Sequence, residues 1–188
     1  MIDYCVLFQM KALLIVDMQV ACFACEPPRH DADGVVRRIN ALAAAMRHRG
    51  MVIFIRHTEP RGDFEHGSAG WQLLPALVAE PGDVFVEKPA CDSFLETNLD
   101  AVLRARGVTE LIITGCATDF CVDTTVRAAG SHGYEVTVAG DAHTTRDRPH
   151  LSAVAVIQHH NYVWADLILP RGRTIRVVPT DQLIRELM

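Results

Sequence analysis

The sequence predicts an α/β fold: one domain with three α/β/α layers around a mostly parallel, Rossmann-like six-stranded sheet. Short apolar segments rich in β-branched residues alternate with longer segments of helical periodicity, which is typical of repeated βαβ units. The chain has 188 residues, the size of one domain, and 49% of them are hydrophobic. Because no Ser/Gly/Pro-rich or strongly charged block divides the chain, we expect residues 1–188 to form a single domain.

The order of strands and helices follows from where the apolar pattern changes. The predicted strands are 12–16, 52–56, 83–87, 110–114 and 135–138, with a sixth near 162–165. The predicted helices are 33–49, 98–106, 119–131 and 149–160, with a short C-terminal helix at 180–187. A glycine follows each of the first three helices, where a left-handed residue commonly ends a helix, and Pro149 suits the first turn of the fourth.

Charge and the N-terminal segment restrict the class of partner. The net charge is only −5 and the basic residues are scattered, which argues against nucleic acid or an anionic membrane as partner and favours a small molecule. Met10 directly precedes the first apolar strand, so translation is expected to start there, with residues 1–9 a non-native or disordered extension. Those nine residues are too short and too poor in positive charge for a signal peptide, and no apolar run approaches the ~20 residues of a membrane span. These features favour a cytoplasmic protein.

The cysteines do not form the pattern of a disulfide framework. There are six of them, and a chain of this length does not depend on such crosslinks. Cys22 and Cys25 form a C-x-x-C motif, but neither a second such pair nor a histidine pair completes a zinc set. We attribute the motif to chance, with redox or metal use as the alternatives.

Three residues with useful chemistry follow predicted strands. Asp17 ends LLIVD, Lys88 ends DVFVEK, and Cys121 follows the fourth strand by a short loop. In an open parallel sheet, reactive groups collect outside the carboxyl ends of the strands. We therefore expect these three residues to converge on one edge of the sheet.

Each of the three has both an ordinary and a functional explanation. Cys121 could be a small core residue, Lys88 could cap the sheet edge, and Asp17 could accept hydrogen bonds from the following turn. Alternatively, a helix N-terminus lowers the pKa of a cysteine thiol below its free value of about 8.5. A lysine ammonium can hold a carboxylate beside a thiolate, and an aspartate can take the thiol proton and deliver it to a leaving amine.

Three segments of the chain resemble the successive signatures of the isochorismatase-like cysteine hydrolase superfamily, which includes nicotinamidases and N-carbamoylsarcosine amidases. The segments are LLIVDMQ, EKPACDSFLETNLDAVLRARGV and LIITGCATDFCVDTTVRAA, and the resemblance extends from about residue 11 to about residue 163. It implies a catalytic triad of Asp17, Lys88 and Cys121 and a non-proline cis peptide between Cys116 and Ala117. It also implies an oxyanion hole formed by the backbone N–H groups of Ala117 and Cys121.

The same resemblance implies a reaction and an assembly. The reaction is hydrolysis of a small-molecule C–N bond, in an amide, ureido compound or lactam, through a thioester intermediate and without a cofactor. Members that hydrolyse the vinyl ether of isochorismate lack the nucleophilic cysteine, so Cys121 favours C–N hydrolysis. A looser resemblance to streptothricin-hydrolase-like members, in GSAGWQLLP and CVDTTVRAA, suggests that a cyclic amide is accepted. The family also implies a homo-oligomer.

One departure from the family pattern concerns metal. Nicotinamidases resemble this chain at GCATDFCV, but they also have an Asp-x-His metal site after the second strand, and IRHTEPRGDFEHG contains no Asp-x-His. We therefore expect no metal. A metal-assisted nicotinamidase with an improvised set of His57, Asp63 and His66 is one alternative, and a catalytically silent scaffold of the same fold is another.

Aromatic residues and histidines complete the predicted site. Phe23, His57, Trp71 and Phe120 are the expected pocket residues, because ligand sites are mostly apolar with a few fixed polar groups; ordinary packing is the alternative. Four late histidines have no partner at helical metal spacing, and we expect most of them at the surface or at an oligomer interface. These are His143, His150, His159 and His160.

Overall fold

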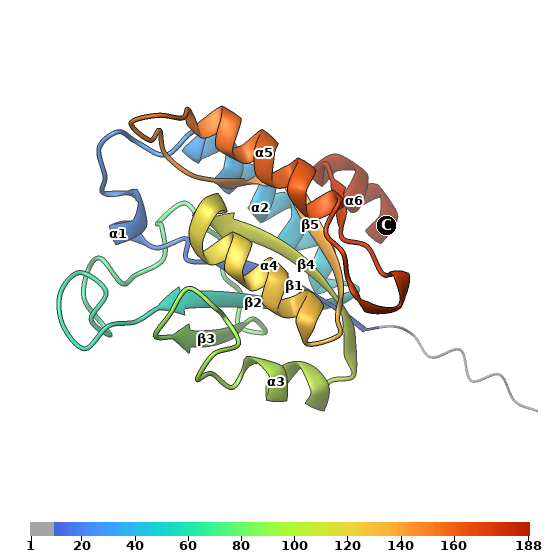
Figure 1. Ribbon diagram of the computed structural model, residues 1–188. Coiled ribbons are helices and arrows are strands. Elements are labelled where there is room, and N and C mark those ends of the chain that lie inside the picture. The colour runs from blue at the N-terminus through green and yellow to red at the C-terminus, as the bar shows by residue number, and fades with distance from the viewer. Residues whose placement is uncertain (1–9) are drawn as a thin grey trace, which may run out of the picture.

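The computed structural model of the protein describes residues 10–188, in which six parallel strands form one sheet between layers of helices (Figure 1). The strands are β1 (Met10–Val16), β2 (Gly50–His57), β3 (Val84–Lys88), β4 (Val108–Cys116), β5 (Glu135–Thr144) and β6 (Arg176–Val178). Their order is β3-β2-β1-β4-β5-β6, and each of the five pairings is parallel. The predicted fold class is therefore confirmed. The predictions for residues 1–9 lie outside the described residues.

Helices cover both faces of this sheet, which explains its continuous apolar strands. The helices are α1 (Val20–Phe23), α2 (Ala32–Arg47), α3 (Leu99–Ala105), α4 (Asp123–Ser131), α5 (Ala153–Ala165) and α6 (Thr180–Leu187), with a π-helix η1 (Thr118–Val122) and a 3₁₀ helix η2 (Pro170–Gly172). One face packs against α3 and α4, and the other against α2 and α6. In Figure 1, α4 crosses in front of the sheet and α2 lies behind it.

Strand β1 shows how the sequence produces these layers. Leu14 and Val16 belong to the core cluster that contains α3 and α4, whereas Leu13 and Ile15 belong to the cluster that contains α2 and α6. All four side chains are buried, since successive residues of a strand point to opposite faces and both faces are covered. Within residues 10–188, no helix combines the length and apolar character needed to cross a membrane.

The predicted sixth strand at 162–165 is wrong, because those residues end helix α5. Trp164 is fully buried and its indole Nε1 donates to Asp123 Oδ1 at 2.7 Å. Its ring packs on His160, one helical turn earlier, with centroids 5.5 Å apart. These contacts favour the helix over the strand preference of the local aromatic and β-branched residues. The sixth strand is β6, which pairs with β5.

Candidate active site

The topology brings three loops together at the centre of the sheet. The chain passes outward from β1 to β2 and β3, then returns to place β4 on the other side of β1. A crevice at such a switch point, outside the carboxyl ends of the strands, is the usual ligand site of open α/β sheets. Asp17 directly follows β1, Lys88 ends β3, and Cys121 lies in η1 after β4.

Lys88 joins these three residues. Its Nζ lies 2.8 Å from Asp17 Oδ2 and 3.3 Å from Cys121 Sγ, and it donates to the carbonyl of Ala90 at 2.8 Å. The side chains of Lys88 and Asp17 are 0% and 3% exposed. Cys121 is half-buried and lines a cavity. The structure therefore places the three predicted catalytic residues in one buried, hydrogen-bonded group.

The charges in this group shift the pKa values of both Lys88 and Cys121. Burial alone would lower the pKa of Lys88, but the Asp17 carboxylate and Cys121 outweigh it and raise that pKa. Burial and the Asp17 carboxylate raise the pKa of the Cys121 thiol, and the Lys88 ammonium opposes this rise. The direction is opposite to the lowering expected from a helix N-terminus. A raised pKa favours the thiol over the thiolate, and use of Cys121 as a nucleophile would then require a base.

Asp17 has a free oxygen for that purpose. Its Oδ2 pairs with Lys88, while Oδ1 is buried and has no hydrogen-bond partner among the described residues. Nearly all buried polar atoms in folded proteins are paired, so this carboxylate oxygen is free to accept a hydrogen bond or a proton from a group in the cavity. His57 Nδ1 is also buried and unpaired among these residues, although His57 Nε2 contacts Glu59 Oε1 at 3.0 Å.

The backbone around the cysteine has unusual geometry. Asp17 has a φ of 48°, in the left-handed region that aspartate tolerates better than most residues. The peptide bond between Cys116 and Ala117 is cis. The carbonyl of Ala117 accepts from the N–H of Val122 at 3.1 Å, an i→i+5 bond that defines the π-turn of η1. Cys121 lies in this widened turn.

Asp119 fixes η1 to the segment after β5. Its Oδ1 accepts from Thr145 Oγ1 at 2.6 Å, and its Oδ2 accepts from Arg148 Nη2 at 2.6 Å. Burial would raise the pKa of Asp119, but the hydrogen bonds from Thr145 and Arg148 lower it. Sequence reasoning missed this residue, because its partners follow a different strand.

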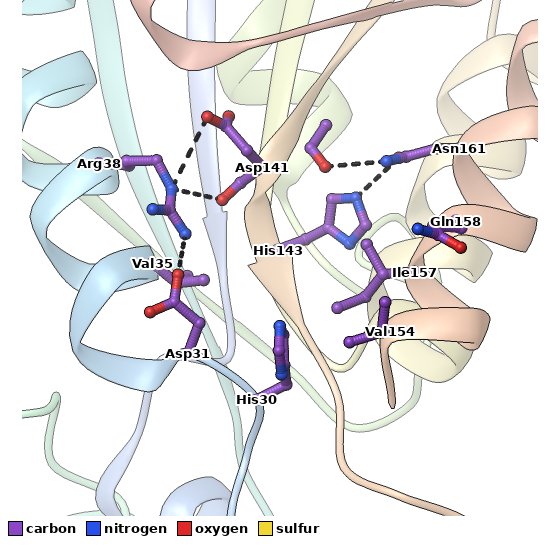
Figure 2. Close-up of a pocket in the computed structure, with 11 residues that line it drawn as sticks. His30, Asp31, Val35, Arg38, Asp141, His143, Val154, Ile157, Gln158 and Asn161 are labelled. Carbon is purple, nitrogen blue, oxygen red and sulfur yellow. Dashed lines mark hydrogen bonds and ion pairs between the residues drawn. The ribbon is translucent and has the colours of Figure 1, made fainter. Parts of the chain in front are cut away.

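A second anchor of η1 is a chain of hydrogen bonds through His143, of which Figure 2 shows the part between His143 and Asn161. Asn161 Nδ2 donates to the carbonyl of Gly140 at 2.8 Å, which leaves Asn161 Oδ1 to accept from His143 Nε2 at 2.9 Å. His143 Nδ1 then accepts from the hydroxyl of Thr118 at 2.9 Å. Burial lowers the pKa of His143 to about 4, so the ring is neutral at physiological pH.

The expectation that most late histidines lie at the surface is therefore wrong for His143, which is 1% exposed. Its position on β5, beneath α5, explains the burial. His150 and His159 are exposed, as expected. His160 is half-buried and its Nδ1 bonds to the carbonyl of Val156, one turn earlier, at 2.8 Å.

A cavity of about 200 Å³ opens beside Cys121. The residues that line it come from several loops and strand ends: Asp17, Cys22, Arg29, His57, Phe64, Cys91, Cys116, Ala117, Phe120 and Cys121. The predicted pocket residues His57 and Phe120 are among them. Sequence reasoning missed Cys22, Arg29, Phe64 and Cys91 as pocket residues, since loop residues follow no periodic pattern that could assign them to a face.

Two other predicted pocket residues do not line this cavity. Trp71 is 5% exposed, its Nε1 donates to Thr58 Oγ1 at 2.9 Å, and the guanidinium of Arg56 lies 3.6 Å from its ring centroid. Phe23 packs against the core cluster that contains α2. Both rings therefore pack against neighbouring side chains, Phe23 from the end of α1 and Trp71 from the segment between β2 and β3.

The described residues contain no arrangement suited to a metal ion. Within residues 10–188, no three His, Cys, Asp or Glu side chains are grouped so that they could hold one. His57 and His66 turn to different carboxylates, those of Glu59 and Glu87, at 3.0 and 3.1 Å. The improvised set of His57, Asp63 and His66 is therefore not formed. In the C-x-x-C motif, Cys25 Sγ contacts the carbonyl of Cys22.

Comparison with known proteins gives consistent matches. The isochorismatase domain family matches residues 11–165. Streptothricin hydrolase from Streptomyces noursei is 35% identical over 142 residues, covering 74% of this chain and 51% of that protein. The chain thus spans about half the length of that relative. Ureidoacrylate amidohydrolase RutB from Methylobacterium radiotolerans is 46% identical over 76 residues, covering 40% of this chain and 30% of RutB. The crystal structure of a cysteine hydrolase from Pseudomonas syringae pv. phaseolicola superposes with a TM-score of 0.84 at 28% identity, covering 94% of this chain and 92% of that one.

Proposed function

The chain belongs to the isochorismatase-like hydrolase family, and from that premise we propose that it is a cysteine-dependent hydrolase of a small-molecule C–N bond in an amide, ureido compound or lactam. The observation that supports this most strongly is the buried group in which Lys88 Nζ contacts both Asp17 Oδ2 and Cys121 Sγ. A carboxylate, an ammonium and a thiol beside a small cavity are the components of nucleophilic catalysis with a general base.

In the first half of the proposed reaction, Cys121 Sγ attacks the substrate carbonyl carbon. Asp17 Oδ1 accepts the thiol proton as the C–S bond forms, which suits a cysteine whose pKa is raised in the free site. The Lys88 ammonium stabilises the negative charge that develops on sulfur. Asp17 then gives the proton to the substrate nitrogen, the C–N bond breaks, and ammonia or an amine leaves a thioester on Cys121.

The carbonyl oxygen becomes negatively charged in the tetrahedral intermediate. The proposed donors to it are the backbone N–H groups of Ala117 and Cys121, which flank the turn that begins at the cis peptide. Each such donor contributes on the order of 10²–10³ in rate. In the second half, Asp17 takes a proton from water and the water oxygen attacks the thioester. The C–S bond breaks, Asp17 returns the proton to Cys121 Sγ, and the product leaves as a carboxylic acid from an amide or lactam, or as a carbamic acid from a ureido compound.

The relatives support C–N hydrolysis over other reactions of the fold. One matching protein is an amidohydrolase that acts on ureidoacrylate, and one solved structure is a cysteine hydrolase. Streptothricin hydrolase is a further hydrolase, matched over three-quarters of this chain. The choice between amide, ureido compound and lactam depends on the cavity walls.

The test is release of ammonia or amine from a panel of amides, ureido acids, imides and lactams. We expect Cys121→Ala to lower kcat/KM by roughly 10⁴-fold or more, because nucleophile and base act as a unit. Cys25→Ser is the matched control, since Cys25 lies outside the cavity and serine retains a donor for the carbonyl of Cys22.

Two other results would replace this function. Turnover of nicotinamide that needs Cys121 and also disappears with chelator, together with stoichiometric zinc, iron or manganese in the protein, would indicate a metal-assisted nicotinamidase. Absence of turnover throughout the panel, together with a Cys121 that iodoacetamide does not alkylate selectively, would indicate a silent scaffold.

A further inference from the structure

The catalytic cavity has one charged lining group that the proposed mechanism does not use, the guanidinium of Arg29. Besides His57, the acidic and basic side chains that line the cavity are those of Asp17 and Arg29. The charge of Asp17 is balanced by Lys88, which lies 2.8 Å away behind it. The positive charge of Arg29 therefore sets the electrostatic character of the cavity.

Arg29 is held in position without having its charge neutralised. Its Nε donates to the carbonyl of Cys22 at 2.9 Å, and the side chain is half-buried. Among residues 10–188, none of the hydrogen bonds or ion pairs involves its two Nη groups. By contrast, Arg38, Arg47 and Arg148 each pair with a carboxylate. A partly buried guanidinium that lines a cavity and whose Nη groups have no partner among residues 10–188 is suited to an anionic ligand.

The position of Arg29 relative to the reacting atoms limits the size of that ligand. Arg29 lines the same cavity as Cys116, the residue that immediately precedes Ala117. In a cavity of about 200 Å³, an anion at Arg29 lies only a few bonds from a carbonyl group at Cys121.

The chemistry of the walls favours a carboxylate over a phosphate. A planar guanidinium matches the two oxygens of a carboxylate, and one arginine balances its single charge. A phosphate has about two charges near neutral pH, and burying the second beside Phe64 and Phe120 without another cation would be unfavourable.

On the premise of the amidohydrolase function above, we propose that Arg29 binds a substrate carboxylate. The substrates are then short amides or ureido compounds whose carboxylate lies a few atoms from the scissile C–N bond. Arg29 is a specificity-determining residue in this scheme, and the neutral part of the substrate lies between Phe64 and Phe120.

The experiment compares matched acid and methyl ester substrates, for example N-carbamoylglycine and its ester, with the wild type, Arg29→Gln and Arg29→Lys. For the acid, we expect Arg29→Gln to lower kcat/KM roughly 10- to 100-fold, mainly through KM, because a charge-assisted hydrogen bond is lost. For the ester, kcat/KM should change little on Arg29→Gln. Arg29→Lys should keep part of the preference for the acid over the ester. Arg37→Gln is the control, since Arg37 is exposed on α2 and does not line this cavity.

A binding measurement separates this inference from the proposed reaction. Calorimetry with the Cys121→Ala variant should show the acid binding more tightly than the ester, and the added substitution Arg29→Gln should abolish that difference. This result would support the carboxylate site even if no turnover were detected. Equal affinities for the acid and the ester would overturn the inference, and so would an equal loss of affinity for both on Arg29→Gln. Arg29 would then be a structural residue that holds the carbonyl of Cys22.

Discussion

Two cavities in this protein differ in size and in how their polar groups are paired. The larger, of about 410 Å³, lies among α2, β5 and α5 (Figure 2), and the smaller, of about 200 Å³, lies beside Cys121. In the larger cavity, Arg38 Nη2 contacts Asp31 Oδ2 at 2.6 Å, Arg38 Nε donates to the carbonyl of Asp141 at 2.6 Å, and His143 bonds to Asn161. In the smaller cavity, Asp17 Oδ1 and His57 Nδ1 are buried without partners among the described residues.

The comparison shows that volume alone is a poor guide to an active site. Three buried side-chain atoms are unpaired in the described part of the chain; two of them belong to residues that line the smaller cavity and none to the larger. Unpaired buried groups are costly in a folded protein, and the two beside Cys121 are available to a ligand in the smaller cavity. The paired groups of the larger cavity instead stabilise the fold. Three predictions test this distinction, beginning with the largest effect.

Lys88→Met should abolish catalysis and also destabilise the protein. The variant leaves the buried Asp17 carboxylate without its ion-pair partner, which typically costs on the order of 3–5 kcal/mol. It also removes the charge that opposes the raised pKa of Cys121. We expect kcat/KM to fall by orders of magnitude and the urea midpoint to fall with it.

The double variant Asp17→Asn with Lys88→Met separates the two effects. Removing both charges should restore much of the stability, since neither buried charge is then unpaired, while activity stays absent. A double variant as unstable as Lys88→Met alone would mean that packing of the lysine stem, and not charge pairing, accounts for the loss.

Stability should fall in acid because of His143. Its pKa is about 4 in the folded protein against 6.5 for an ordinary histidine, so between these values the unfolded chain binds a proton that the native state does not. Unfolding free energy should therefore decrease by up to about 3 kcal/mol as pH falls from 6.5 to 4, and this contribution is absent above pH 6.5. His160 lowers the pKa further, and Asp141 acts in the opposite direction.

Urea unfolding of the wild type and of His143→Gln at several pH values measures the contribution of His143 to the unfolding free energy. The contributions of the other titrating groups are the same in both proteins and cancel when the two free energies are subtracted. A difference that does not change with pH would contradict the assignment of a buried neutral histidine. Catalysis should change far less than in Lys88→Met. An equally large loss of activity would mean that the larger cavity takes part in the chemistry.

Asp141→Ala should have the smallest effect, on stability alone. Asp141 Oδ1 accepts from the backbone N–H of Thr180 at 2.8 Å and from its hydroxyl at 2.6 Å, at the first residue of α6. Loss of this cap should lower the unfolding free energy by about 1–2 kcal/mol. Asp141→Asn keeps an acceptor and should lose less. A fall in kcat/KM comparable with that of the catalytic variants would argue against the separation of the two cavities.

The fold was largely predictable because its strands are long, apolar and regularly separated by helices. The exception, 162–165, shows a limit of local pattern: a helix end that contains Tyr162, Val163 and Trp164 has strand-like composition, and only packing on Asp123 and His160 decides its conformation. Strand β6 is three residues long, too short to show alternation.

For the site, the sequence predicted residues at strand ends and missed residues in loops. Asp17 and Lys88 could be located because each ends a recognisable strand. Arg29 and Phe64 lie in irregular segments whose course depends on tertiary contacts, such as the bond from Arg29 to the carbonyl of Cys22. The raised pKa of Cys121 was also beyond sequence reasoning, since it results from burial beside Asp17.

Gly115 has a consequence for motion at the proposed active site. Its φ is 119°, and a Cβ at this position would overlap the carbonyl oxygen of Val16, so β4 and β1 meet at their ends without an intervening side chain. Val16 immediately precedes Asp17, and Gly115 immediately precedes the peptide that opens the cysteine loop. The proposed base and nucleophile thus follow two strands that are in direct backbone contact. We therefore expect rearrangement on ligand entry and release in the loops that supply Arg29 and Phe64, while the spacing of Asp17 and Cys121 changes little.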